Sequence, residues 1–220
     1  MGHPQPVLRR GRQGLRTGGG WELRDEQTLV QVGPDGEITS LVDVETGRDT
    51  IGDAGPAGRL FLRPDLPNRW DAWDVDAHSL RAGEVLEGSV ASPEDNEIVV
   101  VTPFGKSRAE QRFSLEDGAL KATTCVDWHE QEKMLSMLWP LDLRANSVEA
   151  ETQFGHVTRP LHKNTSWQAA QYLGVNHRWL HVGEPGFGAG IANSSTYGYG
   201  ADRRIRPDGG STTELAVHLH

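Results

Sequence analysis

The segment ETQFGHVTRPLHKNTSW gathers several side chains that could do chemistry. It runs from Glu151 to Trp167 and contains two histidines, an arginine, an asparagine and a tryptophan around one proline. Histidine is both a metal ligand and an acid/base group, and asparagine in an N-x-[ST] sequence can accept a glycan. Taken alone, the spacing leaves four interpretations open: a metal site, a catalytic cluster, a glycosylation signal, or a loop held by its own hydrogen bonds.

The histidine spacing does not favour a metal site. His177 and His181 in HRWLH lack the acidic residue of a helical HExxH zinc motif, and Arg178 stands in its place. We therefore interpret the histidines as hydrogen-bonding groups between strands and loops. The sequence also has no Gly-x-Ser-x-Gly turn and no dinucleotide-binding glycine pattern, and GEPGFGAG is typical of a hairpin connection.

A second polar cluster, RWDAWDVD, has the chemistry of a sugar-binding surface. It places Trp70 and Trp73 beside Asp71, Asp74 and Asp76. Sugars stack their C–H faces on aromatic rings and donate hydroxyl hydrogen bonds to carboxylates. The same composition also occurs where tryptophans anchor the rim of a sandwich and aspartates cap turns, so both interpretations stay open.

Cysteine content and the N-terminal residues indicate a reducing compartment. Cys125 is the only cysteine, and the first twenty residues lack the apolar stretch of a signal peptide, so we expect a cytoplasmic protein. The N-x-[ST] sequences at Asn164 and Asn193 are therefore set aside as glycosylation sites. Cys125 lies in the alternating run ALKATTCVDW, and we expect it to be a buried strand thiol.

Charge and hydropathy exclude two classes of partner. The chain carries 22 basic and 31 acidic residues, a formal charge of −9. This charge repels phosphate backbones and anionic lipid headgroups. No apolar run approaches the roughly 18–20 residues that a membrane span needs. We expect neither a nucleic acid nor a membrane as partner.

The elements that must position these residues are predicted to be short strands. Alternating runs such as TLVQV, EITSLVDV, EIVVVTPFG and ALKATTCVDW are separated by Gly, Pro and Asp turns, and no helical stripe persists for three turns. In ALKATTCVDW, Leu120 to Trp128 at even positions share one face. Helix is expected at most as a short turn near Trp167–Leu173. The pattern predicts an all-β fold, a large antiparallel β-sandwich with little helix.

The two ends of the chain predict a piece of a longer protein. Residues 1–20 carry glycines, arginines and prolines without a hydrophobic period, which is typical of a linker or disordered arm. The last residues, TELAVHLH, alternate without a closing turn. We expect one domain over 21–220, truncated at its C-terminal end.

Beyond single motifs, the order of several motifs resembles a known family. The series is WDAWDVD, VDWHEQEK, ETQFG, RPLHKNTSW, HRW, EPGFG and NSSTYGYG. It resembles the C-terminal β region of glycoside hydrolase family 38 α-mannosidases from about Trp21 to the end. Two positions depart from the pattern: Gln168 and Ser194 stand where the family commonly has Asp.

The resemblance implies a galactose-mutarotase-like supersandwich and an α-mannosidase that hydrolyses α-mannosidic bonds with retention in mannose metabolism. It also implies that catalysis resides elsewhere: the catalytic carboxylates and the zinc ion belong to an N-terminal α/β-barrel domain. The 220 residues alone are then expected to be inactive, with no catalytic or metal-binding residue of their own. The expected partners are that barrel domain, an α-mannoside and, in a homo-oligomer, further copies of the protein.

Under this resemblance, the two polar clusters are candidates for the rim of the substrate cleft. The candidate rim residues are Trp70, Asp71, Trp73, Asp74, Arg159, His162, Asn164 and Trp167. We expect the loop after Arg159 to be held by Arg159, Asn164 and Ser166. Two alternatives stay open: a stand-alone carbohydrate-binding sandwich, and an independent hydrolase or epimerase-like enzyme with His129 and Glu130, or His162, as acid/base groups.

Overall fold

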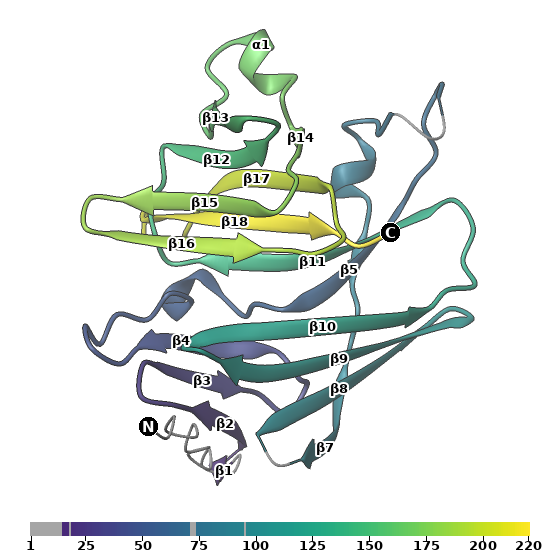
Figure 1. Cartoon of the computed structure of the whole chain (residues 1–220). Coiled ribbons are helices and arrows are strands. Elements are labelled where there is room, and N and C mark those ends of the chain that lie inside the picture. The colour runs from purple at the N-terminus through teal and green to yellow at the C-terminus, as the bar shows by residue number, and fades with distance from the viewer. Residues whose placement is uncertain (1–14, 18, 71–73, 95) are drawn as a thin grey trace, which may run out of the picture.

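The computed structural model describes residues 15–17, 19–70, 74–94 and 96–220. In these residues the strands form four antiparallel sheets, and the only helices are α1 (Ser166–Ala169) and the 3₁₀ turns η1 (Gly52–Ala54) and η2 (Ser79–Arg81). Figure 1 shows how the sheets stack. The predicted all-β sandwich with little helix is confirmed.

The first sheet follows the chain in order. Its strands are β1 (Leu15–Thr17), β2 (Gly20–Arg24), β3 (Thr28–Val32) and β4 (Ile38–Asp43). The turn at Gly33–Gly36, between the runs TLVQV and EITSLVDV that were predicted as strands, joins β3 to β4, and Thr28, Val30 and Val32 alternate into the core. Because β1 already pairs with β2, the first strand begins inside the range that we assigned to an arm.

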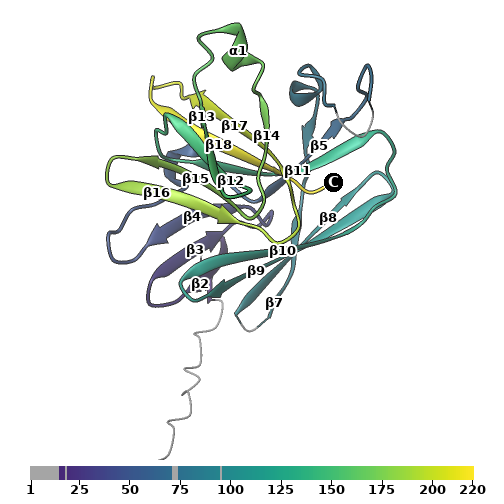
Figure 2. The ribbon, with the colours of Figure 1, turned by 45° about the horizontal axis from the view of Figure 1, so that its top comes forward.

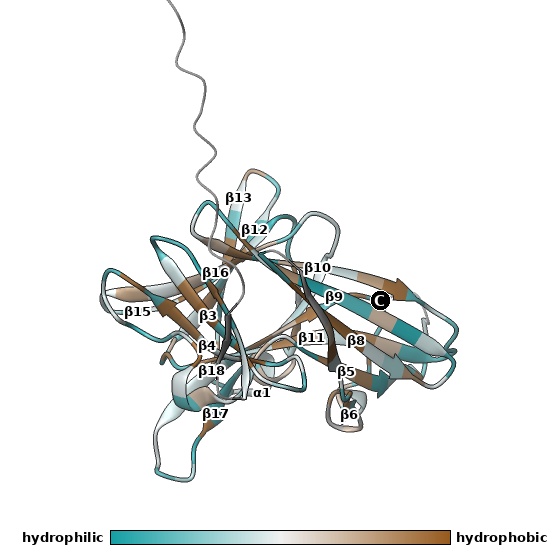
Figure 3. Cartoon of the chain, turned by 90° about the horizontal axis from the view of Figure 1, so that it is seen from below, coloured by the Kyte–Doolittle hydropathy of each residue, from teal (hydrophilic) through white to brown (hydrophobic). Residues whose placement is uncertain are grey.

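The second sheet is a meander of long strands. In spatial order it contains β10 (Ala119–Asp127), β9 (Ser107–Glu116), β8 (Glu97–Phe104) and β7 (Ser89–Glu94). Asp117 and Gly118 both have positive φ, as a two-residue hairpin turn requires. Figure 3 shows hydrophilic and hydrophobic residues along these strands, as expected for a sheet with one solvent face.

Cys125 does not have the predicted environment. The alternation along β10 is as expected, because the face with Leu120, Ala122 and Val126 packs on the core. Cys125 lies on the opposite face, however, and is exposed. Since β10 is the edge strand of a sheet covered on one side only, its second face meets solvent. The prediction of a buried thiol was wrong.

The third sheet is the largest, with six strands. In spatial order these are β14 (Leu173–Val175), β17 (Gly198–Ile205), β18 (Ser211–His218), β11 (Lys133–Leu141), β5 (Arg59–Pro64) and β6 (Glu84–Val85). The C-terminal run TELAVHLH forms most of β18, which is hydrogen-bonded on both sides, by β17 and by β11. That further residues follow His220 in a longer protein stays a prediction.

The fourth sheet carries the motif-rich half of the chain. Its spatial order is β13 (Gly155–Pro160), β12 (Ser147–Thr152), β15 (Trp179–Glu184) and β16 (Phe187–Ala192). The two-residue connection Pro185–Gly186 joins β15 to β16, as predicted for a hairpin. In Figure 1, β15 and β16 lie in front of β17, β18 and β11.

One core connects all four sheets. The largest cluster takes Val30 from β3, Phe113 from β9, Leu180 from β15 and Leu215 from β18, all at 0–1% exposure. A second cluster packs Leu60 of β5 and its neighbours on β11 against Phe104 and Ala109. The six-stranded sheet therefore packs one face on this core, and residues of its opposite face line a pocket.

Figures 1 and 2 both place α1 at the end of the molecule opposite the β7–β8 connection. The segment between β5 and β6 rises toward the same end in both views. This arrangement brings two motifs that are distant in the sequence to one end of the sandwich.

Candidate functional site

The loop after β13 is built around the single turn of α1. The hydroxyl of Thr165 accepts a hydrogen bond from the backbone N–H of Gln168, and the Gln168 side chain accepts from the N–H groups of Asn164 and Thr165. This reciprocal arrangement is a capping box, which satisfies the free donors at the start of a helix. Gln168, one of the two departures from the family pattern, thus shapes the loop.

Two cationic side chains fasten this loop to the six-stranded sheet. Arg159 Nη1 donates to the carbonyl oxygen of Leu173 at 2.6 Å. Lys163 forms an ion pair with Asp202 on β17. Arg159 therefore holds the loop as predicted, but Thr165 and Gln168 supply the hydrogen bonds that we had assigned to Asn164 and Ser166.

The remaining candidates on this loop face outward. Trp167 is 82% exposed and Asn164 is also exposed, so both are free to meet a ligand. His162 is half-buried, and its Nδ1 has no hydrogen-bond partner in the part of the chain that the structure describes. The loop offers an aromatic ring, an amide and an imidazole at one end of the sandwich.

The second cluster lies on the segment between β5 and β6. Trp70 is 69% exposed and has a positive φ of 65°. Its carbonyl oxygen accepts from the N–H of Asp74 at 3.0 Å, and an oxygen of Asp76 accepts from the N–H of Asn68 at 3.1 Å. Asp71 and Trp73 lie outside the described residues.

A side chain that our sequence reasoning missed joins the two clusters. The hydroxyl of Tyr172, four residues after Gln168, donates to the carbonyl oxygen of Val75 at 2.8 Å. Burial, together with the nearby carboxylates of Asp74 and Asp76, raises the pKa of Tyr172. Tyr172 belongs to no recognisable motif. Only its position next to the predicted loop, directly before the short strand β14, could have marked it as a candidate.

The exposed side chains at this end of the molecule have the chemistry of a sugar-binding surface. Exposed tryptophans can stack on sugar rings, and carboxylates and amides can hydrogen-bond hydroxyl groups. No group of three or more His, Cys, Asp or Glu side chains that could hold a metal occurs among the described residues. The described residues therefore offer no site for a metal ion, and the zinc ion that the family resemblance implies is expected in the barrel domain.

The histidines singled out from the sequence make separate contacts. His181 on β15 pairs with Glu149 at 3.2 Å, and His177 packs on the ring of Tyr197 with centroids 5.5 Å apart. His156 packs on the ring of Trp179, 6.0 Å away. These contacts between neighbouring strands and loops agree with the structural interpretation of the histidines.

The alternative acid/base pair has other partners. His129 Nε2 lies 2.9 Å from a carboxylate oxygen of Asp127. Glu130 accepts hydrogen bonds from the N–H of Lys106 and the hydroxyl of Ser107, and these bonds lower its pKa. A carboxylate that caps a hairpin turn and stays ionised is a poor general acid, so the geometry disfavours this pair as an acid/base couple.

The fold and the site define a class: an antiparallel sandwich domain with an exposed polar and aromatic end. A family model described as the glycosyl hydrolases family 38 C-terminal domain matches residues 23–220. The chain therefore belongs to this family of C-terminal domains. In the described residues, no helix is both long and apolar enough to cross a membrane.

Curated relatives are named as α-mannosidases. The chain is 34% identical over 179 residues to human Alpha-mannosidase 2C1, covering 77% of this chain and 17% of that protein. It is 32% identical over 191 residues to Alpha-mannosidase G of Dictyostelium discoideum, covering 80% of this chain and 18% of that protein. The chain thus spans less than one fifth of the length of these relatives.

A solved structure shows the same fold. The crystal structure of an alpha-mannosidase from Enterococcus faecalis V583 superposes with a TM-score of 0.68 at 14% identity. The match covers 90% of this chain and 25% of that one. At this identity the likeness supports the architecture alone.

Proposed function

We propose that this chain is the C-terminal β-sandwich domain of an α-mannosidase that hydrolyses α-mannosidic bonds with retention. The observation that carries the proposal is the family match over residues 23–220, together with relatives that are α-mannosidases several times longer. The reaction would take place in a separate α/β-barrel domain that supplies the catalytic carboxylates and zinc. The protein would act in mannose metabolism in the cytoplasm.

Within that enzyme, the end of the sandwich that carries Trp70 and Trp167 would line the substrate cleft. The hydrogen bond from Tyr172 to Val75 supports this role, because it holds the two polar segments side by side. Exposed tryptophan, carboxylate and amide groups match the apolar faces and hydroxyls of a mannoside.

The experiment compares three single variants of the complete enzyme. Trp167→Ala and Asn164→Ala remove candidate rim side chains, and Ile205→Ala removes an equally exposed apolar side chain, 79% exposed, outside both segments. We expect Trp167→Ala to raise KM for an α-mannoside by roughly threefold to tenfold, the loss of about 1 kcal/mol of stacking. Unchanged KM and kcat in both rim variants would show that the rim assignment is wrong.

The exposed tryptophans also favour a second function, carbohydrate binding by the isolated domain. Calorimetric titration of the 220-residue chain with mannose or a manno-oligosaccharide separates the two functions. Heat that disappears in Trp167→Ala supports an independent binding module. No heat supports a domain that works only when packed against its catalytic partner.

A further inference from the structure

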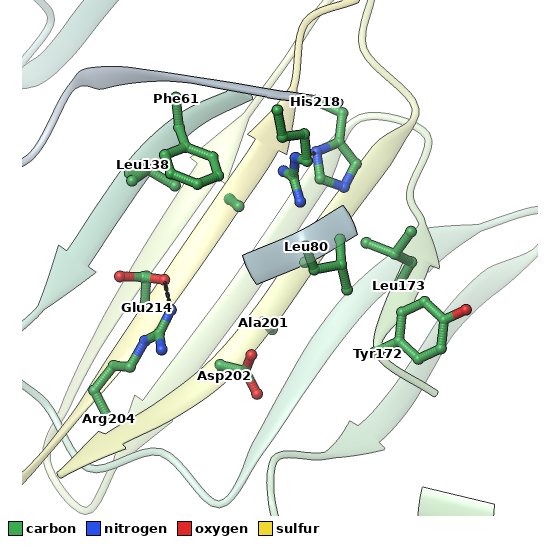
Figure 4. A pocket seen from close by; sticks show the side chains of 13 residues that line it. Phe61, Leu80, Leu138, Tyr172, Leu173, Ala201, Asp202, Arg204, Glu214 and His218 are labelled. Carbon is green, nitrogen blue, oxygen red and sulfur yellow. Dashed lines mark hydrogen bonds and ion pairs between the residues drawn. The ribbon is translucent and has the colours of Figure 1, made fainter. Parts of the chain in front are cut away.

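The outer face of the six-stranded sheet contains a pocket of about 120 Å³. Its floor consists of residues from β5, β11, β17 and β18. Figure 4 shows Leu80 of η2 lying over this floor, with Leu173 and Tyr172 at one side and Phe61 and Leu138 at the other. The pocket is distinct from the exposed tryptophans of the candidate rim.

A buried polar cluster forms one wall. Arg63 is 4% exposed, His218 is 9% exposed and Ser136 is fully buried. Arg63 Nη2 donates to Ser136 Oγ at 2.5 Å, and Ser136 Oγ lies 2.8 Å from His218 Nδ1. A serine oxygen can accept from two donors, but Arg63 Nη2, which can only donate, also lies 3.5 Å from His218 Nδ1, so Nδ1 is an acceptor and the Ser136 hydroxyl donates to it. His218 therefore carries its proton on Nε2.

Two hydrogen-bond donors of this cluster have no acceptor among the described residues. Arg63 Nε and His218 Nε2 are both buried, and neither has a hydrogen-bond partner within the described protein. Burial, with Arg63 as a second cause, lowers the pKa of His218 to about 3, and burial also lowers the pKa of Arg63. At neutral pH the wall therefore presents a fixed positive charge and a neutral N–H donor.

The acidic side chains that line the pocket are paired with other cations. Glu214 accepts from Arg204 at 2.6 Å, and Asp202 pairs with Lys163. The charges of Asp65 and Glu214 raise the pKa of Arg63, against the lowering by burial. Arg63 has three uncharged partners in the structure: Ser136 Oγ, His218 Nδ1 and the ring of Phe61, whose centroid lies 5.5 Å from Cζ. Burial of a guanidinium is costly, and an anion in the pocket would offset that cost.

We propose that this pocket binds one carboxylate group, which accepts hydrogen bonds from Arg63 and His218. The wall formed by Arg63 and His218 offers donors and positive charge, and the flat guanidinium fork matches the two oxygens of a carboxylate. Asp202 and Glu214 also line the pocket, but each is paired with a cationic side chain, Lys163 and Arg204. The small volume admits a group of a few atoms, and Phe61 and Leu138 supply an apolar wall for the carbon next to the carboxylate. The carboxylate is either that of a free small acid or that of an acidic side chain.

The test uses acetate as the probe and the imidazole nitrogens of His218 as the readout. We titrate the 15N-labelled 220-residue chain at pH 7 with sodium acetate, against sodium chloride at equal ionic strength. Acetate is expected to shift the His218 Nε2 signal with a Kd on the order of millimolar, the range that so small a ligand reaches. The other histidines serve as internal references.

Three variants separate specific binding from a general salt effect. Arg63→Gln removes the charge, and Ala216→Leu fills the pocket while leaving Arg63 and His218 in place. Arg112→Gln removes an arginine that is paired with Glu97 and Glu110 on another sheet. We expect the acetate shift to be lost in the first two variants and kept in the third.

The result that overturns the proposal is a His218 signal that does not respond to acetate, or that responds equally to chloride, in the folded wild-type chain. A response that survives Ala216→Leu overturns it as well, even if Arg63→Gln does not fold. Repeating the titration on the complete α-mannosidase distinguishes the two sources of the carboxylate, and this arm alone rests on the proposed function. A free acid gives a response there too, whereas an acidic side chain of the parent gives a signal already shifted and insensitive to acetate.

Discussion

Nη1 of Arg159 lies 2.6 Å from the carbonyl oxygen of Leu173 and ties the end of β13 to the start of β14. The two residues belong to different sheets, so this hydrogen bond joins the four-stranded sheet of β13, β12, β15 and β16 to the six-stranded sheet. The loop between them contains α1, Trp167 and Tyr172. The position of this loop therefore depends in part on a charged side chain near the end of β13.

Replacing Arg159 by methionine is expected to destabilise the protein. The substitution keeps most of the apolar stem but leaves a carbonyl oxygen without its charged donor, which costs roughly 1–3 kcal/mol. Lys163→Met is the matched control, because its ion pair with Asp202 is about 40% exposed and contributes less than about 1 kcal/mol. Urea unfolding of both variants measures the difference, and equal losses would contradict the assigned role of Arg159.

Thr165→Ala is expected to loosen α1 without unfolding the domain. The variant removes the hydroxyl that accepts from the Gln168 N–H, and loss of such a cap costs about 1 kcal/mol. Amide hydrogen exchange at Ala169 and Ala170, whose N–H groups bond within this turn, should become several-fold faster. Ser194→Ala, an exposed loop residue elsewhere, should leave these two amides unchanged.

Two glycines with the same backbone conformation provide a matched pair. Gly36 and Gly47 have φ of 79° and 71°. A Cβ at Gly36 would lie closer than 3.0 Å to both Cγ atoms of Val100, whereas a Cβ at Gly47 meets no atom within 4 Å. Gly47→Ala should therefore cost only the left-handed backbone strain of about 1–2 kcal/mol.

Gly36→Ala should cost that strain and, in addition, about 1–3 kcal/mol for crowding in the core. Thermal and urea unfolding of the two variants gives the difference directly. Indistinguishable stabilities would mean that the first and second sheets do not meet at Gly36 and Val100 as the structure shows.

The buried imidazole of His218 makes stability depend on pH in a defined direction. Its pKa falls from 6.5 to about 3 in the folded protein. Between these two values the unfolded chain takes up a proton that the folded chain does not, so acid favours unfolding. The contribution is complete above pH 6.5 and is lost as the pH falls toward 3, by up to about 1.4 kcal/mol per pH unit.

The measurement compares the unfolding free energy of the wild type with that of His218→Asn from pH 7 down to pH 4. Asparagine keeps an acceptor for the hydroxyl of Ser136 but does not titrate. The difference between the two proteins should therefore grow smaller as the pH falls. A difference that is independent of pH would show that His218 is exposed and ordinary.

Much of the fold was predictable because its signals are local. Alternation assigns Val30 and Val32 of β3 and Leu120 and Ala122 of β10 to the correct faces, since side-chain direction in a strand depends only on neighbouring residues. The pair Asp117–Gly118 likewise has the residue types that a two-residue hairpin turn requires, and both residues have positive φ. The order of the motifs indicated the family, and the match of the family model to residues 23–220 confirms it.

The local sequence pattern did not predict burial correctly where burial depends on whether another part of the chain covers that face of the sheet. Cys125 was assigned to the correct face of its strand, yet that face meets solvent because β10 is an edge strand of a sheet covered on one side only. The loop after β13 was recognised as structured, but its hydrogen bonds come from Thr165 and Gln168. A short sequence does not reveal which of several polar neighbours makes the bond.

The sequence by itself determined that this protein is an all-β chain of the glycoside hydrolase family 38 C-terminal type, because strand alternation, turns and motif order are all written along the chain. Only the tertiary structure decided which distant residues meet. Tyr172 reaches Val75 across 97 positions, and Arg63 reaches His218 across 155. Such contacts depend on the order in which strands pair, and that order follows from packing of the whole core rather than from any local pattern.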